Sequence, residues 1–203
     1  MSDSDLDPKG LVPDRADTAL VILDLISDFQ FDDGAKIARA ALPVARRIAR
    51  LKARAAEARV PALYVNDAVG RWRSDFQGML RQCRRANARG RPVVDAIAPS
   101  ADDYCILKPK HSGFFATPLD TIIKYLGAKR LIITGVSSHQ CVLFTANDAY
   151  VRDLELLIPR DCISARSPQE TRLALQYFRS VLGADLTPSA RIRLTATRAK
   201  RQC

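Results

Sequence analysis

Short apolar runs alternate with longer amphipathic stretches along most of the chain. Each run holds only four or five residues, and most of these are aliphatic or β-branched. Runs of this length without a polar alternation are typical of parallel strands that are covered on both faces. They are Ala19–Leu23, Ala62–Val65, Tyr104–Leu107, Leu131–Thr134 and Leu154–Ile158. The pattern predicts five buried strands, and Ala184–Thr187 is expected to add a short sixth strand at the edge.

The stretches between these runs have the period of helices. Apolar residues recur three and four positions apart in the clearest case, which is Ile37, Ala41, Val44, Ile48, Leu51 and Ala55. Further helices are expected over Phe76–Ala88, from Thr117-Pro118 to Gly127, from about Cys141 to Arg152, and after the capping sequence Ser167–Glu170. Alternating strands and helices predict a three-layer α/β/α fold, Rossmann-like, with a mostly parallel six-stranded sheet.

The length of the chain fits a single domain. Of its 203 residues, 47% are apolar and 27% are charged, which suits a globular chain with a core. We expect an N-terminal tail over 1–17, one domain over 18–190 and a basic C-terminal tail over 191–203. The apolar runs are far shorter than the roughly 18 residues that span a bilayer, so no transmembrane helix and no membrane partner are predicted.

Charge and cysteine content exclude several other classes. The first residues are acidic and lack a secretory pattern, so a cytoplasmic location is expected. Five cysteines without a C-x-x-C spacing do not suggest a disulfide framework. The net charge of +10 comes largely from arginines interleaved with alanines, as on solvated helix faces. We therefore expect no specific nucleic-acid partner, although a basic protein that binds nucleic acid is an alternative.

Candidate chemistry lies where the predicted strands end. Ligands of an open parallel sheet bind beyond the carboxyl ends of its strands. Asp24 follows the first strand, Lys108 follows the third, and a turn after the fourth leads to Cys141. A thiol at a helix N-terminus near a lysine is expected to have a lowered pKa, and a nearby aspartate could accept its proton. The cysteines without such neighbours, Cys83, Cys105 and Cys162, are interpreted as structural.

Three segments resemble the signatures of one known family. They are Leu20–Phe29, Ile106–Phe115 and Thr134–Ala149, in the same order and at the same kind of strand end. Together they look like the motifs of the isochorismatase-like cysteine hydrolases, and the resemblance extends from about Thr18 to Asp185.

The resemblance implies a role for each residue of the motifs. Asp24 would be the general base, Lys108 the cationic member and Cys141 the nucleophile. Lys110 is a rival for the role of Lys108, but the family spacing to Ser112 favours Lys108.

The resemblance also implies a special turn before the nucleophile. A cis peptide is expected between Val136 and Ser137, with the N–H groups of Ser137 and Cys141 forming an oxyanion hole.

Departures from the family pattern narrow the activity. Metal-binding members carry an Asp-x-His pair after the second strand, whereas Asp67 is followed here by Ala68 and Val69, so no metal or other cofactor is expected. Members that cleave a vinyl ether lack the cysteine, so Cys141 favours acyl transfer. His111 stands where the family usually has Tyr or Phe, and His139 replaces a more common Asp.

Substrate contacts are expected mainly from the loop Gly70–Phe76. Arg71 and Arg73 could bind a carboxylate and Trp72 could stack on a planar group, although these arginines could equally bridge to Asp75 or to a neighbouring subunit. The remaining candidates for substrate binding are Phe29, Asn66, Phe114 and His139.

The sequence therefore predicts an amidohydrolase. It would cleave a small amide or ureido C–N bond through an acyl-thioenzyme, and the substrate would be anionic if the two arginines bind it. Alternatives are vinyl-ether or ester hydrolysis on the same scaffold, or a catalytically idle member that binds a partner. The family resemblance implies a homo-oligomer, either a dimer or a tetramer.

Overall fold

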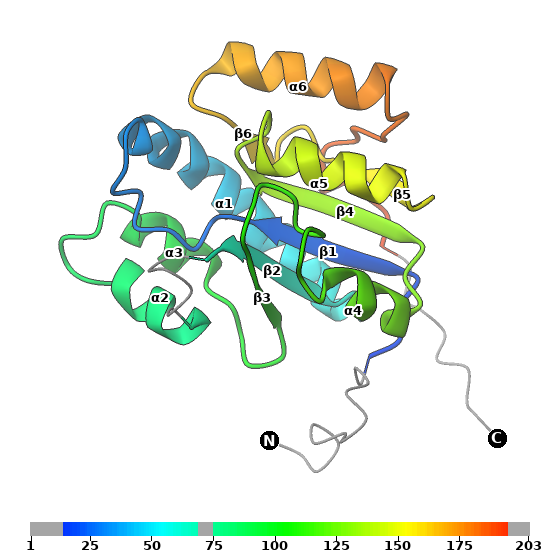
Figure 1. Cartoon of the computed structure of the whole chain (residues 1–203), viewed down its shortest axis with the longest axis horizontal. Coiled ribbons are helices and arrows are strands. Elements are labelled where there is room, and N and C mark those ends of the chain that lie inside the picture. Colours follow the sequence, from blue (N-terminus) through cyan, green and yellow to red (C-terminus); the bar gives the residue numbers. More distant parts are fainter. Residues whose placement is uncertain (1–13, 69–74, 195–203) are drawn as a thin grey trace.

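A parallel β-sheet forms the middle layer of the protein (Figure 1). The computed structural model describes residues 14–68 and 75–194. The strands are β1 (Thr18–Leu23), β2 (Ala62–Asp67), β3 (Tyr104–Lys108), β4 (Arg130–Val136), β5 (Glu155–Leu157) and β6 (Ile163–Ser164). Their order is β3-β2-β1-β4-β5, and β6 pairs with the end of β4. This six-stranded parallel sheet confirms the predicted fold class.

Helices cover both faces of the sheet. They are α1 (Gly34–Glu57), α2 (Phe76–Cys83), α3 (Arg91–Ile97), α4 (Leu119–Leu126), α5 (Cys141–Tyr150) and α6 (Pro168–Ser180), with a short 3-10 turn at Ser189–Arg191. Side chains of α1, α2 and α3 pack in one apolar cluster, and those of α4, α5 and α6 pack in a second. Among the helices of the described ranges, none has the length and apolar character that a membrane crossing requires.

Strand β1 shows how the sequence pattern produces these layers. Its five residues from Ala19 to Leu23 are fully buried. Leu20 and Ile22 join the cluster beneath α1, whereas Ala19, Val21 and Leu23 join the cluster beneath α5. Successive strand residues point to opposite faces, so a continuous apolar run is what a strand between two helical layers requires. The predicted apolar stripe of α1 is also buried, apart from the half-buried Ile37.

Three local predictions are wrong. The sixth strand is Ile163–Ser164, and the segment expected to form it contributes only an isolated bridge between Leu157 and Asp185. The helix expected over 76–88 ends at Cys83, and α3 follows it unpredicted. Cys105 is exposed because β3 lies at the sheet edge, whereas Cys83 and Cys162 are buried as expected of structural thiols.

The carboxyl ends of the central strands lie close together. In the register of the sheet, Leu23 pairs with Val65 on one side and with Gly135 on the other, and Asp67 pairs with Lys108. Gly135 has φ 115°, and a Cβ there would lie only 2.1 Å from the carbonyl oxygen of Leu23. A residue without a side chain is therefore needed for β4 to approach β1 at this edge.

Gly135→Ala is expected to lower the free energy of unfolding by about 3 kcal/mol or more, because the added Cβ would overlap the β1 backbone. Gly127→Ala is a matched control, since Gly127 also has a positive φ of 76° but has no atom within 4 Å of the added Cβ. It should cost only about 1–2 kcal/mol. Urea unfolding of both variants measures the difference, and equal losses would contradict the role of close packing at Gly135.

Candidate active site

Two strand ends and one helix start bring a carboxylate, an ammonium and a thiol together. Asp24 follows β1, Lys108 ends β3, and Cys141 is the first residue of α5. The Nζ atom of Lys108 lies 3.0 Å from Oδ2 of Asp24 and donates to Sγ of Cys141 at 3.4 Å. The structure thus places side by side the three residues that the sequence selects as catalytic.

The backbone around Asp24 holds its carboxylate in place. Asp24 has φ 52°, a left-handed conformation that aspartate tolerates better than most residues. Its N–H donates to the Val65 carbonyl at 3.1 Å, and its Oδ1 accepts from the N–H of Asp67 at 2.8 Å. Oδ2 is buried and lies 3.0 Å from the ammonium of Lys108. Because Oδ1 already accepts from a backbone N–H, Oδ2 is the oxygen that we expect to take a proton.

Lys108 is the buried charge at the centre of the site. Its side chain is 0% exposed, and its ammonium also pairs with the carboxylate of Asp67. An ammonium has three N–H donors, and Asp24, Asp67 and Cys141 supply three acceptors around it. Burial alone would lower the pKa of Lys108, but the negative charges of Asp24 and Asp67 outweigh it and raise that pKa. The lysine is therefore a permanent cation at physiological pH.

The pKa of the Cys141 thiol differs from the one that the sequence analysis predicts. Burial, reinforced by the negative charge of Asp24, raises its pKa, and the opposing effect of Lys108 is smaller. The prediction of a lowered pKa is thus wrong, because the lysine charge is shared with two carboxylates and the site is buried. Cys141 is a protonated thiol before substrate binds, and it needs a base to become a nucleophile.

Asp24 can serve as that base near neutral pH. Burial raises the pKa of its carboxyl to about 6, while Lys108 lowers it and Asp67 raises it. At pH 7 the carboxylate is therefore mostly ionised, yet it is far more basic than an ordinary aspartate. The protonated Cys141 thiol therefore has beside it a carboxylate, that of Asp24, which is basic enough to accept its proton.

The turn before Cys141 has an unusual backbone and leaves two N–H groups outside its own hydrogen bonds. The peptide between Val136 and Ser137 is cis. Among the described residues, the backbone hydrogen bonds of this turn use the N–H groups of Ser138, Gln140 and Val142. The N–H groups of Ser137 and Cys141 take part in none of these hydrogen bonds. Both residues line a cavity above the site.

A cavity of about 320 Å³ opens above the three residues. Asp24 and Cys141 form part of its wall, and Phe29 and Asn66 line it as the sequence analysis expects. The other described lining residues are Ile26, Ser27, Asp28, Phe31, Ile37, Asp67, Met79, Gln82, Cys83, His111, Val136, Ser137 and Gln140. The predicted contacts Arg71, Trp72 and Arg73 lie outside the described residues.

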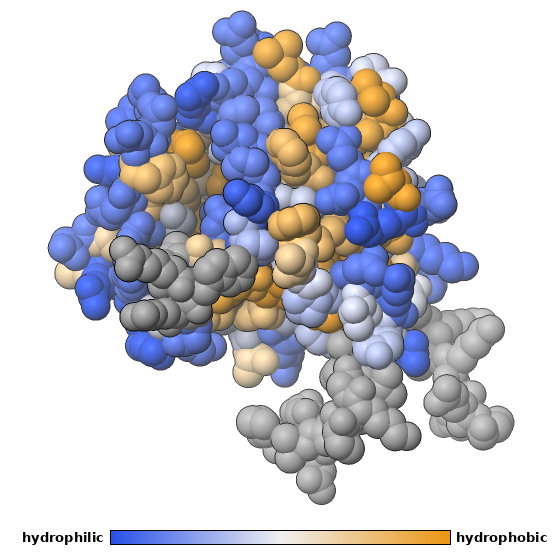
Figure 2. Space-filling model, viewed as in Figure 1, coloured by the Kyte–Doolittle hydropathy of each residue, from blue (hydrophilic) through white to orange (hydrophobic). Residues whose placement is uncertain are grey.

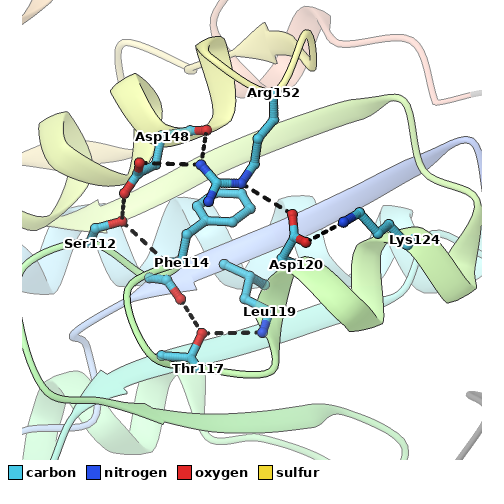
Figure 3. Close-up of polar contacts among 9 residues, drawn as sticks. Ser112, Phe114, Thr117, Leu119, Asp120, Lys124, Asp148 and Arg152 are labelled. Atoms are coloured by element: carbon cyan, nitrogen blue, oxygen red, sulfur yellow. Dashed lines mark hydrogen bonds and ion pairs between the residues drawn. The ribbon is translucent and has the colours of Figure 1, made fainter.

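Two predicted substrate contacts lie elsewhere. Phe114 is buried in the core, and the guanidinium of Arg152 covers its ring at 4.5 Å (Figure 3). His139 faces α6, where its Nε2 lies 4.0 Å from a carboxylate oxygen of Glu170. Neither lines the cavity. Packing in the core directs Phe114 away from this cavity, and the carboxylate of Glu170 lies beside His139, so the structure does not bring either residue to the described part of the site.

Two site residues were not predicted as such. Asp67 pairs with Lys108, and the Nδ1 atom of His111 lies 3.7 Å from Sγ of Cys141. Asp67 could have been found from its position at the end of the second strand, next to the strand that precedes Asp24. His111 could have been found from its chemistry, since an imidazole between Lys108 and Ser112 replaces an aromatic residue that cannot accept a proton.

The same residues include the atoms of a possible metal-binding group. One oxygen each of Asp24 and Asp67 and the sulfur of Cys141 lie within 4.8 Å of one another. The ammonium of Lys108 contacts all three residues, however. A metal ion among these ligands would have to displace this ammonium or bind beside it against its charge. The donor set therefore fits a lysine better than a metal.

A parallel sheet that ends in this set of side chains is that of a cysteine hydrolase with a three-layer α/β fold. The chain belongs to the isochorismatase family, since the family model described as the isochorismatase domain matches residues 18–190. It is 39% identical to the isochorismatase family protein YaaI of Bacillus subtilis (strain 168), with coverage of 88% of this chain and 97% of that protein.

Relatives with named activities include amidohydrolases. The chain is 29% identical to the ureidoacrylate amidohydrolase RutB of Methylobacterium radiotolerans, over 87% of this chain and 78% of that protein. Among solved structures, the N-carbamoylsarcosine amidase of Thermoplasma acidophilum superposes with a TM-score of 0.65 and 28% identity, covering 88% of this chain and 99% of that chain. The family and these neighbours support hydrolase activity.

The pH dependence of turnover should report Asp24. Because its carboxylate must be ionised to accept a proton and its pKa is raised to about 6, kcat/KM should fall about tenfold per pH unit below pH 6. Asp67→Asn removes a negative charge that raises this pKa, so the acid limb should move to lower pH. Profiles from pH 4.5 to 8 on one amide substrate test both statements. An acid limb that is unmoved by Asp67→Asn would contradict the coupling.

Chelation is expected to leave the protein unchanged. Because Lys108 supplies the positive charge among Asp24, Asp67 and Cys141, dialysis against EDTA should alter neither turnover nor the melting temperature. Metal analysis of the purified protein gives the second measurement. About one equivalent of zinc or iron, lost together with activity on chelation, would show that a metal occupies this group.

Proposed function

We propose that the protein hydrolyses the C–N bond of a small amide or ureido compound through an acyl-thioenzyme. The observation that carries this proposal is the carboxylate of Asp24 and the thiol of Cys141 close together, both in contact with the Lys108 ammonium. A base, a nucleophile and a fixed positive charge are the minimum set for nucleophilic catalysis with a protonated thiol.

The acylation step follows from this arrangement. Asp24 takes the proton of Cys141 as the sulfur attacks the substrate carbonyl, and a C–S bond forms. The carbonyl oxygen gains negative charge and accepts hydrogen bonds from the N–H groups of Ser137 and Cys141. The tetrahedral intermediate collapses with cleavage of the C–N bond, and Asp24 returns the proton to the departing nitrogen.

Deacylation uses the same groups in reverse. The ionised Asp24 accepts a proton from water, whose oxygen attacks the thioester carbonyl. The C–S bond breaks, and the proton on Asp24 returns to the sulfur of Cys141. One proton thus shuttles between the carboxylate and the reacting groups, and Lys108 remains charged throughout.

The walls of the cavity suggest which substrates fit. Asn66 is 2% exposed; its Nδ2 donates to the Ile26 carbonyl at 3.0 Å, and its Oδ1 has no partner among the described residues. A substrate N–H would satisfy this acceptor. The described lining also includes Asp28 and Asp67 together with apolar side chains such as Met79. These features favour a small, neutral compound with N–H donors.

Substitution of the three central residues tests the proposal. Cys141→Ser and Asp24→Asn should each lower kcat/KM by about 10²–10⁴-fold or more, since one removes the thiol and the other the base. Lys108→Ala should also disable turnover, and its residual activity should rise towards high pH because the thiol loses a stabilising charge. The matched control is Lys110→Ala, which removes a nearby exposed lysine and should leave the pH profile in place.

The measurement is ammonia release from a panel of small amides, carbamoyl amino acids and ureido acids. Mass spectrometry of the protein during turnover should detect an acyl adduct on the peptide that contains Cys141. Circular dichroism of Lys108→Ala checks folding, because a buried ion pair is broken. Wild-type rates for Cys141→Ser would overturn the acyl-thioenzyme. Turnover of esters or vinyl ethers without any amide would favour the alternative chemistry, and an inert wild type would favour a binding role.

A further inference from the structure

A second proton-accepting group faces the thiol of Cys141. The Nδ1 atom of His111 lies 3.7 Å from Sγ, within reach of a hydrogen bond that involves sulfur. His111 lines the same cavity as Asp24 and Cys141, and its side chain is exposed to solvent. The sulfur therefore has a buried carboxylate and a solvent-facing imidazole within its reach.

The position of His111 is fixed by the helix that carries the nucleophile. The hydroxyl of Ser112 donates to the carboxylate of Asp148, and the N–H of Gly113 donates to Oγ1 of Thr145 at 2.9 Å. Both acceptors belong to α5, which begins at Cys141, and Figure 3 shows the first of these contacts. The segment that follows β3 is thus tied to α5 directly beyond His111.

The imidazole ring is also held from its side. Its centroid lies 5.4 Å from that of Phe144, with an angle of 50° between the rings. Phe144 is half exposed. The face of the molecule in Figure 2 carries apolar side chains among hydrophilic ones. The contact with Phe144 adds one packing partner for the imidazole ring.

The charged and titratable groups around His111 come from four elements. They are Lys108 and Lys110 on its own segment, Asp24 after β1, Asp67 at the end of β2, and Cys141 and Asp148 on α5. Lys108 is saturated by its three acceptors, and Asp148 accepts from Ser112 and Arg152. Among the described residues, the Cys141 thiol is therefore the group that lies within hydrogen-bond distance of Nδ1 of His111.

We infer that His111 is a second catalytic base for Cys141, alongside Asp24. In the tautomer with hydrogen on Nε2, the unprotonated Nδ1 accepts the thiol proton. The S–H bond breaks, an N–H bond forms, and the electron pair stays on sulfur, which gives a thiolate beside an imidazolium. The reverse transfer restores the thiol, and solvent can exchange the proton through the exposed ring. This inference rests on the proposed nucleophilic role of Cys141.

Two bases around one thiol have a measurable consequence. Either base alone should still generate some thiolate, so loss of Asp24 should leave a residual reactivity that depends on His111. Direct ionisation of the thiol, whose pKa is raised, requires high pH. The contribution of His111 should therefore appear as reactivity of Cys141 below that range.

The experiment follows the alkylation of Cys141 by iodoacetamide and needs no substrate. Rate constants are measured from pH 5.5 to 9.5 by peptide mass spectrometry, which separates Cys141 from the other thiols. The variants are wild type, His111→Phe, His111→Gln, Asp24→Asn and the double variant Asp24→Asn/His111→Phe. Phe keeps a ring against Phe144, and Gln keeps a polar group that cannot titrate in this range. Lys110→Gln is the control for loss of positive charge on the same segment.

His111→Phe and His111→Gln should both lower the rate constant at pH 7 by about tenfold while leaving the high-pH limb in place, as expected when one of two bases is lost. Asp24→Asn should retain reactivity at pH 7, and the double variant should lose it. Lys110→Gln should match wild type. Rates and profiles that are unchanged in both His111 variants would overturn the inference. Failure of the proposed function would be distinguishable, because it would appear as wild-type turnover by Cys141→Ser.

Discussion

The buried ammonium of Lys108 is the interaction on which the site depends. Two carboxylates and a thiol meet at one edge of the sheet, and the ammonium contacts both carboxylates and offsets the repulsion between their negative charges. Conversely, the ammonium is 0% exposed and could not stay charged without these acceptors. The sheet order β3-β2-β1 supplies this arrangement directly, because it sets the ends of the three strands that carry Lys108, Asp67 and Asp24 next to one another.

This constraint decides which group is ionised before substrate arrives. The charge of Lys108 acts on Asp24, Asp67 and Cys141 at once, and the carboxylates ionise more readily than the thiol. Lys108 therefore keeps Asp24 basic but ionised, and Cys141 stays protonated because burial and the Asp24 charge raise its pKa. A thiol in this state reacts slowly unless a base takes its proton. Its activation is deferred until a carbonyl group is in place to accept the sulfur.

The sequence predicts the parts of this molecule that follow a regular period or end a strand. The buried β1 and the stripe of α1 are set by periods that a single sequence displays. Strand β6 has two residues and α3 has seven, too few for a period to emerge, and tertiary contacts decide them. Gly90, which precedes α3, would place a Cβ 1.8 Å from the carbonyl oxygen of Ser27, a contact that no local pattern reveals.

The same distinction holds for the site. Asp24, Lys108 and Cys141 occupy strand ends or a helix start, and topology alone brings them together. Asp67 also ends a strand, but no motif marks it, and its role depends on the register that pairs it with Lys108. The directions of Phe114 and His139 are set by packing against Arg152 and by the carboxylate of Glu170. Such directions depend on neighbours that are distant in sequence, so residue type and spacing do not determine them.

Because Lys108 is saturated by protein acceptors, it and the groups that bind the substrate carbonyl have different roles in the proposed mechanism. Each of the three ammonium donors has an acceptor within the protein, so none remains for the substrate carbonyl. A bound metal at the same place could coordinate that oxygen through an open position, whereas this lysine cannot. In the proposed mechanism the developing oxyanion is stabilised by the backbone N–H groups of Ser137 and Cys141, which belong to residues of the cavity wall and are not used in the backbone hydrogen bonds of the described turn. The Lys108 charge and the N–H groups proposed to bind the oxyanion are thus different groups. The close packing of β4 against β1 at Gly135 helps to set their relative position.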